Sequence, residues 1–439
     1  MTRRATLAIW VLALIPTFIA APGLTDADWN SPNAVFNGLG RLTGISGLGF
    51  LLVAACISSR VPGFDRAFGG LTKLWRTHHL LGGVAFLLLL AHPLLLAFGR
   101  GHSATDATGL LFPAFNAWPI WAGWGALVLM MLFLGPSFSF FGRPPYQRWK
   151  WVHKLAAPAI VLALAHAFAL DRTLPPPFDY LVWGTLSLLA VAALAYRWLF
   201  SLARLRVAGG RFPYKVTDVR PVSQGVVEIS LLETGRRLAY EPGQFVYLTP
   251  FDETLKSGLN EEHPFTLSSA PAETGLRITI KDLGDASRAL QKIRSGSNVS
   301  IEGPYGAFFP RHEDDSPELW IAGGIGITPF LSRARTLRQP GSSTSRICLI
   351  LCVQDEARAL FADELRDIAD ALPNFEFRLH YFYQQGPLDQ TFINACCQDL
   401  ESRHVYICGP PALLSLASRL ALEGGVKANA IHTEEFDLL

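Results

Sequence analysis

Two long apolar segments, each carrying two histidines, constrain the fold of this chain more than any other feature. The first covers residues 75–98 and the second residues 149–170. Each is close to the roughly 20 apolar residues that a helix needs to cross a bilayer. The histidines are His78 and His92 in the first segment and His153 and His166 in the second. A histidine within such a helix is costly unless it pairs or coordinates, so the segments predict a functional site inside a membrane bundle.

The histidine spacing suits two metal centres stacked across one membrane. Fourteen residues separate His78 from His92, which returns close to the same helix face and rises about 21 Å. Thirteen residues separate His153 from His166, about 140° apart on an ideal helix, and Pro158 between them could reset the phase through a kink. Zinc needs four close ligands, whereas haem iron takes one axial ligand from each side. The pattern predicts two haems; polar residues satisfied inside a bundle are the alternative.

Hydropathy predicts six membrane helices in the first half of the chain. The 439 residues are 50% hydrophobic and 17% charged, which is a poor match to one soluble domain. The apolar segments lie at about residues 5–22, 36–58, 74–98, 118–141, 149–170 and 178–202. The first could be a signal peptide, because Arg3 and Arg4 precede it, but Pro22 and Gly23 make a poor cleavage site. We expect a retained helix.

Loop charges predict the orientation of these helices. The loops at one end hold most of the cations: Arg3, Arg4, Arg60, Arg66, Lys73, Arg76, Arg143, Arg148, Lys150, Arg204, Arg206, Arg211 and Lys215. The loops at the other end hold only Arg100 and Arg172, together with four aspartates. By the positive-inside rule both termini are cytoplasmic. The chain is therefore predicted to be an integral protein of the cytoplasmic membrane.

This orientation sorts the histidines by depth. His78 and His153 lie toward the cytoplasmic side and are expected to pair around an inner haem. His92 and His166 lie toward the outer face and are expected to pair around an outer haem. His79, beside His78, is the competing inner ligand.

Arg41 is a candidate catalytic residue near the outer end of the second predicted helix. It is the one cation within an otherwise apolar span, in the segment GLGRLTG. Its depth suits two roles equally. The side chain either snorkels to the lipid headgroups or pairs with a haem propionate or small anion beside the outer haem.

Charge and cysteine usage narrow the functional class. The formal charge is +2, and no basic cluster beyond the loop charges indicates nucleic-acid binding. All six cysteines fall on predicted membrane or cytoplasmic stretches, so disulfides are not expected. Their spacing is not that of iron–sulfur ligands.

The second half of the chain has the composition of a soluble protein. Residues 202–211 are predicted to be a linker, and short β-rich runs between Phe212 and about Arg311 predict a small antiparallel barrel. From Leu319 strands alternate with helices, which predicts a doubly wound α/β sheet. The predicted domains are residues 1–205 (a six-helix all-α transmembrane bundle), 206–312 (an antiparallel β-barrel) and 313–439 (an α/β nucleotide-binding domain).

A glycine-rich turn opens the last predicted domain. The segment AGGIGITPF, Ala322–Phe330, places three glycines where a strand gives way to a helix. Such a turn lets backbone amides approach phosphate oxygens at the helix N-terminus. It is neither a G-x-G-x-x-G fingerprint nor a P-loop, so a strand–helix turn without a ligand is the alternative.

Five motifs in order give the chain a resemblance to known proteins. They are HPFTLSS (263–269), GDASRAL (284–290), EGPYG (302–306), AGGIGITPF (322–330) and CGPPALL (408–414). The soluble half resembles the ferredoxin–NADP reductase superfamily. The whole chain resembles the transmembrane NADPH oxidase and ferric reductase family, which places a six-helix bis-haem domain before that module. This resemblance implies FAD, two haem b groups, and NADPH or NADH as electron donor.

The resemblance also implies roles for individual residues. The flavin and its phosphates would contact His263, Pro264, Phe265, Thr266, Ser287 and Gly303. The dinucleotide phosphates would contact Gly323, Gly324, Gly326 and Thr328, and the nicotinamide would meet the flavin near Cys408 and Gly409. Phe436, in the terminal IHTEEFDLL, would cover the flavin face, although ordinary packing of a terminal strand is the alternative. Ser287 stands in GDAS, where the family usually has an aromatic residue and threonine.

The cofactors set the expected order of electron transfer. NAD(P)H gives two electrons together, whereas each haem accepts one, so FAD is expected between them. The electrons would then reach oxygen, a ferric chelate or a periplasmic redox protein. Short external loops without an acidic cluster favour oxygen. Gln354 stands where NADPH-preferring relatives usually have an arginine, so NADPH preference is in doubt unless Arg333, Arg335 or Arg358 compensates.

Overall fold

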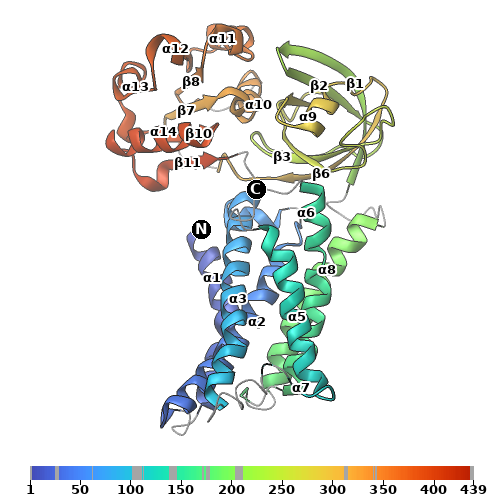
Figure 1. Cartoon of the computed structure of the whole chain (residues 1–439). Coiled ribbons are helices and arrows are strands. Elements are labelled where there is room, and N and C mark those ends of the chain that lie inside the picture. Colours follow the sequence, from blue (N-terminus) through green and yellow to red (C-terminus); the bar gives the residue numbers. More distant parts are fainter. Residues whose placement is uncertain are drawn as a thin grey trace. The chain divides into compact units, whose positions relative to one another are not determined.

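The chain divides into two compact units (Figure 1). The computed structural model describes residues 2–24, 29–61, 63–100, 111, 113–137, 146–170, 173–174, 178–202, 211–310, 315–339, 341 and 344–435. The first unit comprises Met1–Arg60 and Lys73–Ala203, and the second comprises Val61–Thr72 and Arg204–Leu439. A short segment between two helices of the first unit therefore belongs to the second unit.

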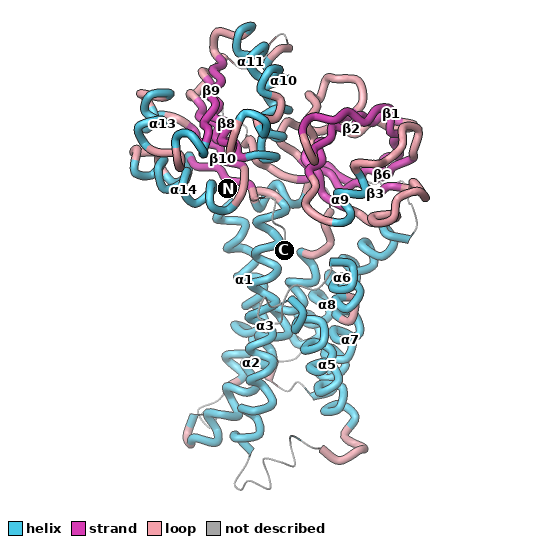
Figure 2. The backbone as a smooth tube through the Cα atoms, turned by 45° about the horizontal axis from the view of Figure 1, so that its top comes forward, coloured by secondary structure: helices cyan, strands magenta, loops and turns pink. Residues whose placement is uncertain are grey.

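The first unit is helical. Its helices are α1 (Thr2–Ala20), α2 (Pro32–Ile57), α3 (Leu71–Arg100), α5 (Trp118–Leu134), α6 (Tyr146–His153), α7 (Ala156–Leu170) and α8 (Phe178–Leu202). Figure 2 shows them running alongside one another, with contacts between α1 and α2, α5 and α7, and α2 and α8. They form the all-α part that the sequence predicts.

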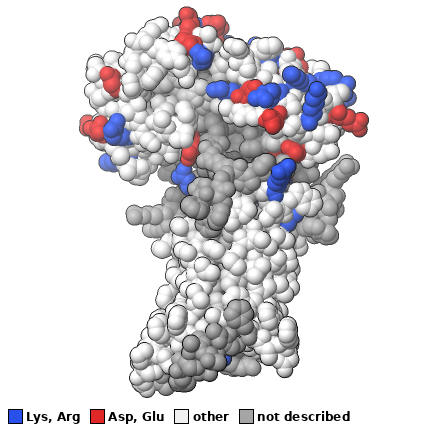
Figure 3. Space-filling view, in the orientation of Figure 1, with Lys and Arg blue, Asp and Glu red and all other residues white. Residues whose placement is uncertain are grey.

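Four of the six predicted spans are long and apolar enough to cross a membrane. Among the described residues these are Pro32–Ile57, Leu71–Arg100, Trp118–Ser137 and Arg148–Leu170. The first and last predicted spans correspond to shorter apolar helices, Ala5–Ala20 and Tyr180–Tyr196. Large apolar side chains face outward, such as Leu87, Val161 and Leu188. On the face that Figure 3 shows, the described part of this unit carries few charged side chains, as a surface facing lipid requires.

Helix α2 approaches its neighbours closely because it is rich in glycine. Ser31 caps its N-terminus by accepting a hydrogen bond from the Ala34 amide at 3.2 Å. A Cβ on Gly49 would come within 2.8 Å of the Ala13 carbonyl oxygen of α1. A Cβ on Gly47 would come within 2.6 Å of the Leu89 side chain of α3. Small residues thus bring three helices together, as in other membrane bundles.

The second two-histidine segment is broken between its histidines. Helix α6 ends at His153, and α7 starts three residues later. Pro158 has no N–H group to donate to the carbonyl of Lys154, four residues before it. The Ala157 amide donates to that carbonyl instead, at 3.2 Å. The interruption therefore lies four residues before the proline and changes the phase of His153 relative to His166.

The second unit begins with an antiparallel half-barrel. Its strands are β1 (Arg211–Ser223), β2 (Val226–Glu233), β3 (Phe245–Pro250), β4 (His263–Thr266), β5 (Leu276–Lys281) and β6 (Asn298–Tyr305), in the order β4-β3-β6-β1-β2-β5. A short helix, α9 (Asp285–Leu290), follows β5. Apolar side chains that include Ile229, Val246, Leu267, Ile278 and Ile301 fill its core. The antiparallel β domain is where the sequence predicts it.

A parallel five-stranded sheet completes the second unit. Its strands are β7 (Glu318–Gly323), β8 (Ile347–Val353), β9 (Phe375–Tyr381), β10 (His404–Cys408) and β11 (Ile431–Glu434), in the order β11-β10-β7-β8-β9. The helices are α10 (Thr328–Leu337), α11 (Ala362–Ala371), α12 (Phe382–Gln385), α13 (Gln390–Cys396) and α14 (Pro411–Glu423). Separate apolar clusters cover the two faces of the sheet. The strand order reverses between β7 and β10, and ligands of doubly wound sheets bind at such a switch point.

The segment Val61–Thr72 packs against the end of β6. The Gly306 amide donates to the Asp65 carboxylate at 2.9 Å, and the Asp65 side chain is buried. Burial raises the pKa of Asp65, although the Gly306 hydrogen bond opposes the rise. Gly70 lies beside Ala307, where a Cβ would come within 3.4 Å of the amide nitrogen.

Candidate functional sites

The helical unit brings the four predicted histidines together as two facing pairs. The ring centroids of His92 and His166 are 6.0 Å apart, and those of His78 and His153 are 6.2 Å apart. The partners come from α3 and from the α6–α7 segment. His79 lies beside His78 with an exposed side chain, and His78 is the ring that faces His153.

Backbone carbonyls fix the orientation of three of these rings. The Nδ1 atom of His92 lies 2.7 Å from the Gly40 carbonyl oxygen, and that of His166 lies 2.8 Å from the Pro119 carbonyl oxygen. The Nδ1 atom of His78 lies 2.9 Å from a third carbonyl, that of Ala54 on α2. A carbonyl oxygen can only accept, so Nδ1 carries the proton and donates it. Nε2 then presents its lone pair, as a metal ligand must.

Two glycines make room for the outer pair of rings. A Cβ on Gly44 would lie 2.5 Å from His92 Nδ1, and a Cβ on Gly123 would lie 2.6 Å from His166 Nδ1. Gly44 lies four positions after Gly40 on α2, and Gly123 lies four positions after Pro119 on α5, so each glycine follows the residue whose carbonyl accepts the hydrogen bond. Both helices thus use the same arrangement: a carbonyl holds the imidazole, and a glycine one turn later leaves space for it.

The spacing of each pair fits a haem iron held between two imidazoles. An iron midway between centroids 6.0 Å apart would be about 3 Å from each. A metal–nitrogen bond of about 2 Å leaves about 1 Å, which matches the distance from the centre of an imidazole to its nitrogen. Among the described residues no group of three or more His, Cys, Asp and Glu side chains could hold an ion by itself. Two ligands on opposite sides are what haem requires.

A largely apolar cavity surrounds the outer pair. Its volume is about 450 Å³, and its walls include His92, His166, Trp124, Met130 and Trp183. Arg41 and Arg100 also line it. Arg41 is the candidate that the sequence predicts, whereas Arg100 is predicted only as part of an external loop. Two cations beside an apolar cavity suit the two carboxylates of a haem.

Five of the six predicted flavin residues line one cavity of about 360 Å³ in the second unit, and Gly303 does not. Four of the residues that line it come from β4: His263, Pro264, Phe265 and Thr266. Ser287 at α9 and Thr328 at the start of α10 close the opposite side. The cavity is also lined by Thr72, Lys281, Glu434 and Glu435, which the sequence did not single out. Motifs that are separate in the sequence thus line one cavity, while Phe436 lies outside the described residues.

The Ser287 hydroxyl forms its hydrogen bonds with the backbone of its own turn. It accepts hydrogen bonds from the amides of Leu283 and Gly284, both at 2.9 Å, and donates to the Gly284 carbonyl at 3.0 Å. These bonds shape the turn that enters α9. Gly303, the other predicted flavin residue of the half-barrel, lies in β6 beside Val246, with φ +151°.

The glycines of the AGGIGITPF turn allow two backbones to meet at the switch point. A Cβ on Gly326 would lie 2.3 Å from the Cys408 carbonyl oxygen, and one on Gly323 would lie 2.6 Å from the Leu413 side chain. A Cβ on Gly409 would lie 3.1 Å from the backbone of Gly323, and Gly324 has φ +54°. Burial raises the pKa of the Cys408 thiol well above its ordinary value, so the thiol stays protonated.

The three arginines considered as substitutes at the Gln354 position have different surroundings. Arg333 donates to Glu318 at 2.9 Å and lies over the Phe309 ring. Arg335 is buried between carboxylates of two domains. Arg358 pairs with Asp355 at the carboxyl end of β8, is largely exposed, and follows Gln354 by four residues. Of the three, Arg358 has the most exposed side chain.

Family comparisons match three consecutive parts of the chain. Residues 43–164 match a ferric reductase like transmembrane component, residues 211–308 match an FAD-binding domain, and residues 320–419 match an oxidoreductase NAD-binding domain. Together these matches cover most of the chain. They coincide with the helical unit, the half-barrel and the parallel sheet.

Individual proteins are similar to about half of the chain. The ferredoxin reductase component of the 3-ketosteroid-9-alpha-monooxygenase of Mycolicibacterium smegmatis is 30% identical over 209 residues, which are 46% of this chain and 57% of that protein. A flavohemoprotein of Halalkalibacterium halodurans is 29% identical over 231 residues, which are 46% of this chain and 54% of that protein. This chain thus spans little more than half the length of these relatives. The FAD/NAD-binding domain of a Vibrio cholerae nitric oxide dioxygenase is 23% identical, with a TM-score of 0.45, over 51% of this chain and 98% of that one.

Proposed function

Because this chain belongs to the ferric reductase and NADPH oxidase family, we propose that it passes electrons from cytoplasmic NAD(P)H through FAD and two haem b groups to an acceptor beyond the membrane. It is a membrane flavoprotein oxidoreductase. We further propose that α1 and α8 join the four longer spans to make six, with both termini in the cytoplasm. Residues 1–205 would then form the haem domain, 206–312 the FAD domain and 313–439 the NAD(P)H domain.

One observation carries this proposal: the two histidine pairs, with centroids 6.0 and 6.2 Å apart. Each pair joins the same two helical segments, and in three of the four rings Nδ1 donates to a carbonyl. Histidines that ligate a metal usually donate their other ring N–H to a partner such as a backbone carbonyl. This arrangement favours metal ligation through Nε2.

We propose a role for each group of site residues. His92 and His166 would hold the outer haem and His78 and His153 the inner one, with Arg41 balancing the charge of the outer propionates. The β4 segment His263–Thr266 would position the flavin, and the amides of the Gly323–Thr328 turn would bind the dinucleotide phosphates. FAD supplies the change from two-electron to one-electron transfer when it is bound. Cys408 and Gly409 would lie at the nicotinamide, and Phe436 at the flavin face.

We propose oxygen as the acceptor, reduced to superoxide. If His92 and His166 both hold the outer haem, no coordination position would remain for the acceptor, so transfer would occur at the haem edge. The loops predicted to lie outside are short and carry no acidic cluster that would bind a metal chelate. A ferric chelate is the second candidate, supported by the matched transmembrane component. A periplasmic redox protein is the third.

Cytochrome c reduction by the purified full-length protein tests the choice of acceptor. Superoxide formation predicts that superoxide dismutase abolishes most of the NAD(P)H-dependent reduction. Reduction that persists with the dismutase and under nitrogen would contradict the oxygen proposal. Rapid reduction of ferric citrate under the same anaerobic conditions would favour the ferric-chelate alternative.

The dinucleotide preference gives a separate prediction. Gln354 provides no charge for a 2′-phosphate, so we expect NADH to be used about as well as NADPH. Gln354→Arg should favour NADPH by about 10- to 100-fold in kcat/KM, because a hydrogen bond to a charged group contributes about 1.5–3 kcal/mol. Steady-state kinetics with both dinucleotides measures this shift.

Gln398→Arg is the matched control for this prediction. It adds the same charge at an exposed position between α13 and β10, and should leave the preference unchanged. A wild-type protein that already prefers NADPH by a hundredfold would contradict the prediction. Arg358→Gln would then show whether Arg358 supplies the missing charge.

A further inference from the structure

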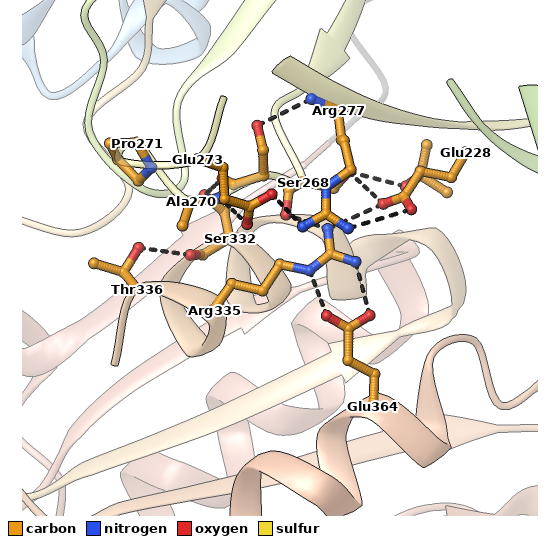
Figure 4. A network of polar contacts seen from close by, with 12 residues as sticks. Glu228, Ser268, Ala270, Pro271, Glu273, Arg277, Ser332, Arg335, Thr336 and Glu364 are labelled. Atoms are coloured by element: carbon orange, nitrogen blue, oxygen red, sulfur yellow. Dashed lines mark hydrogen bonds and ion pairs between the residues drawn. The ribbon is translucent and has the colours of Figure 1, made fainter. Parts of the chain in front are cut away.

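Arg335 is a buried cation that joins the half-barrel to the parallel sheet within the second unit. Its side chain, on α10, is 3% exposed. Nε and Nη2 donate to the Glu364 carboxylate of α11, at 2.6 and 2.7 Å. Nη1 donates to Glu228 Oε1 of β2 at 3.0 Å and to the Ser268 carbonyl at 2.8 Å. Figure 4 shows the guanidinium between the carboxylates of the two domains.

The geometry of this contact permits little displacement. Glu228 is buried and also accepts hydrogen bonds from Arg220 at 2.9 Å and from the Ser268 hydroxyl at 3.2 Å. The planar guanidinium has its donors in a fixed fork, so it satisfies both carboxylates only in one orientation. Separation of Glu228 from Arg335 would break a charge-assisted hydrogen bond between two buried side chains, although Glu228 would keep Arg220 and Arg335 would keep Glu364. The two domains are therefore held in one register.

A second side chain of α10, that of Ser332, binds the carbonyl of Ser269, which follows the Ser268 carbonyl that Arg335 binds. The Ser332 hydroxyl, which is fully buried, donates to the Ser269 carbonyl at 2.6 Å. Arg335 binds the carbonyl of Ser268, so one helix holds two successive carbonyls. Ser268 and Ser269 have no exposed surface, and water cannot replace these donors.

The two segments that this contact joins also carry residues that line the cavity proposed for the flavin. Thr266 ends β4 two residues before Ser268, and Thr328 begins α10 seven residues before Arg335. Thr266 and Thr328 line the cavity of about 360 Å³. A shift of α10 relative to Ser268 would therefore move one wall of the cavity against the other.

We propose that Arg335 is a positioning residue that sets the separation of the flavin and the nicotinamide, and thereby the rate of hydride transfer. This inference rests on the proposed transfer from NAD(P)H to FAD. In that step a C–H bond of the dihydronicotinamide breaks and an N–H bond forms on the flavin, with both electrons moving together. Misplacement of the reacting atoms by about 1 Å can lower the rate about 10²-fold.

Anaerobic stopped-flow measurement of flavin reduction in the full-length protein tests this assignment. Arg335→Met should lower the limiting rate at saturating NADH by about 30- to 100-fold. Bound flavin and the half-saturating NADH concentration should stay within about threefold, because Arg335 contacts neither cofactor wall directly. NADH deuterated at C4 should show a larger isotope effect in this variant. Arg335→Lys keeps the charge without the fork and should give an intermediate rate.

Ser332→Ala provides a milder second arm, because it leaves every buried charge paired. We expect a loss of about 3- to 10-fold in the limiting rate. Ser223→Ala is its matched control. It removes another hydroxyl–carbonyl bond between the same two domains, from Ser223 to Ala357 at 3.0 Å, at an exposed position. This control should reduce its flavin at the wild-type rate.

The outcomes separate this inference from the proposed function. Wild-type limiting rates in Ser332→Ala and Arg335→Met would overturn the positioning role, and so would a loss that matches a loss of bound flavin. If Arg335→Met does not fold, Ser332→Ala compared with Ser223→Ala decides the question. A wild-type flavin that neither NADH nor NADPH reduces would overturn the proposed function itself, and this inference with it.

Discussion

Replacing His92 or His166 with alanine should remove the same haem from the protein and leave about half of the haem absorbance. The two rings face each other at 6.0 Å, so either change would remove one of the two imidazoles proposed to hold the same haem. Electron transfer to external acceptors should fall to background, because the proposed route passes last through the outer haem. Flavin reduction by NADH should continue. Haem content per flavin and a redox titration of the remaining haem measure the effect.

The inner pair supplies the complement to this experiment. His78→Ala and His153→Ala should remove the other haem, whereas His79→Ala, on the adjacent exposed residue, should retain both. Full haem content in His92→Ala or His166→Ala would contradict the outer pairing. Loss of haem in His79→Ala with retention in His78→Ala would show that the inner ligand is His79.

Adding a single methyl group beside an outer histidine should also destabilise haem binding while both ligands stay in place. In Gly44→Ala the new Cβ would lie 2.5 Å from His92 Nδ1, and in Gly123→Ala it would lie 2.6 Å from His166 Nδ1. Each overlap forces the ring away from the carbonyl that orients it, and loss of such an outer partner typically weakens metal binding by about 10- to 100-fold. Haem retention during dilution or competition with apomyoglobin measures this loss.

Gly82→Ala is the control for these glycine changes. It adds the same methyl group to α3 at a position where no atom lies within 4 Å of the new Cβ. Haem retention should match the wild type. Normal retention in both Gly44→Ala and Gly123→Ala would mean that the rings do not need their carbonyl partners.

The sequence contained enough to select the four histidines, because apolar helices make an imidazole conspicuous. It also indicated that Pro158 disturbs the second segment, and the break lies at Lys154, the carbonyl that a proline at position 158 cannot pair. The partners of the rings were not predictable. Gly40 and His92 are 52 residues apart, and no local pattern connects a glycine carbonyl on one helix with an imidazole on another.

In the soluble half, too, local sequence patterns predicted the secondary structure but not the contacts between distant residues. Strand and helix patterns predicted the two β-containing domains, and motif residues such as Thr266 and Thr328 line one cavity. The role of Arg335 was not predictable from the sequence, where it was a possible phosphate ligand. Its carboxylate partner Glu228 is 107 residues away in another domain. Burial and pairing of a cation depend on such tertiary contacts, which a short motif does not encode.

The segment Val61–Thr72 has a consequence for the exchange of domains between related proteins. The second unit is discontinuous in sequence: it includes this segment as well as residues from Arg204 onward. A chimaera joined only at residue 204 would combine the Asp65 carboxylate of one parent with the Gly306 amide and Thr266 cavity wall of another. To transfer the whole second unit, a chimaera needs three crossover points, at residues 60/61, 72/73 and 203/204. A chimaera that exchanges the FAD- and NAD-binding domains therefore has to exchange the Val61–Thr72 segment with them.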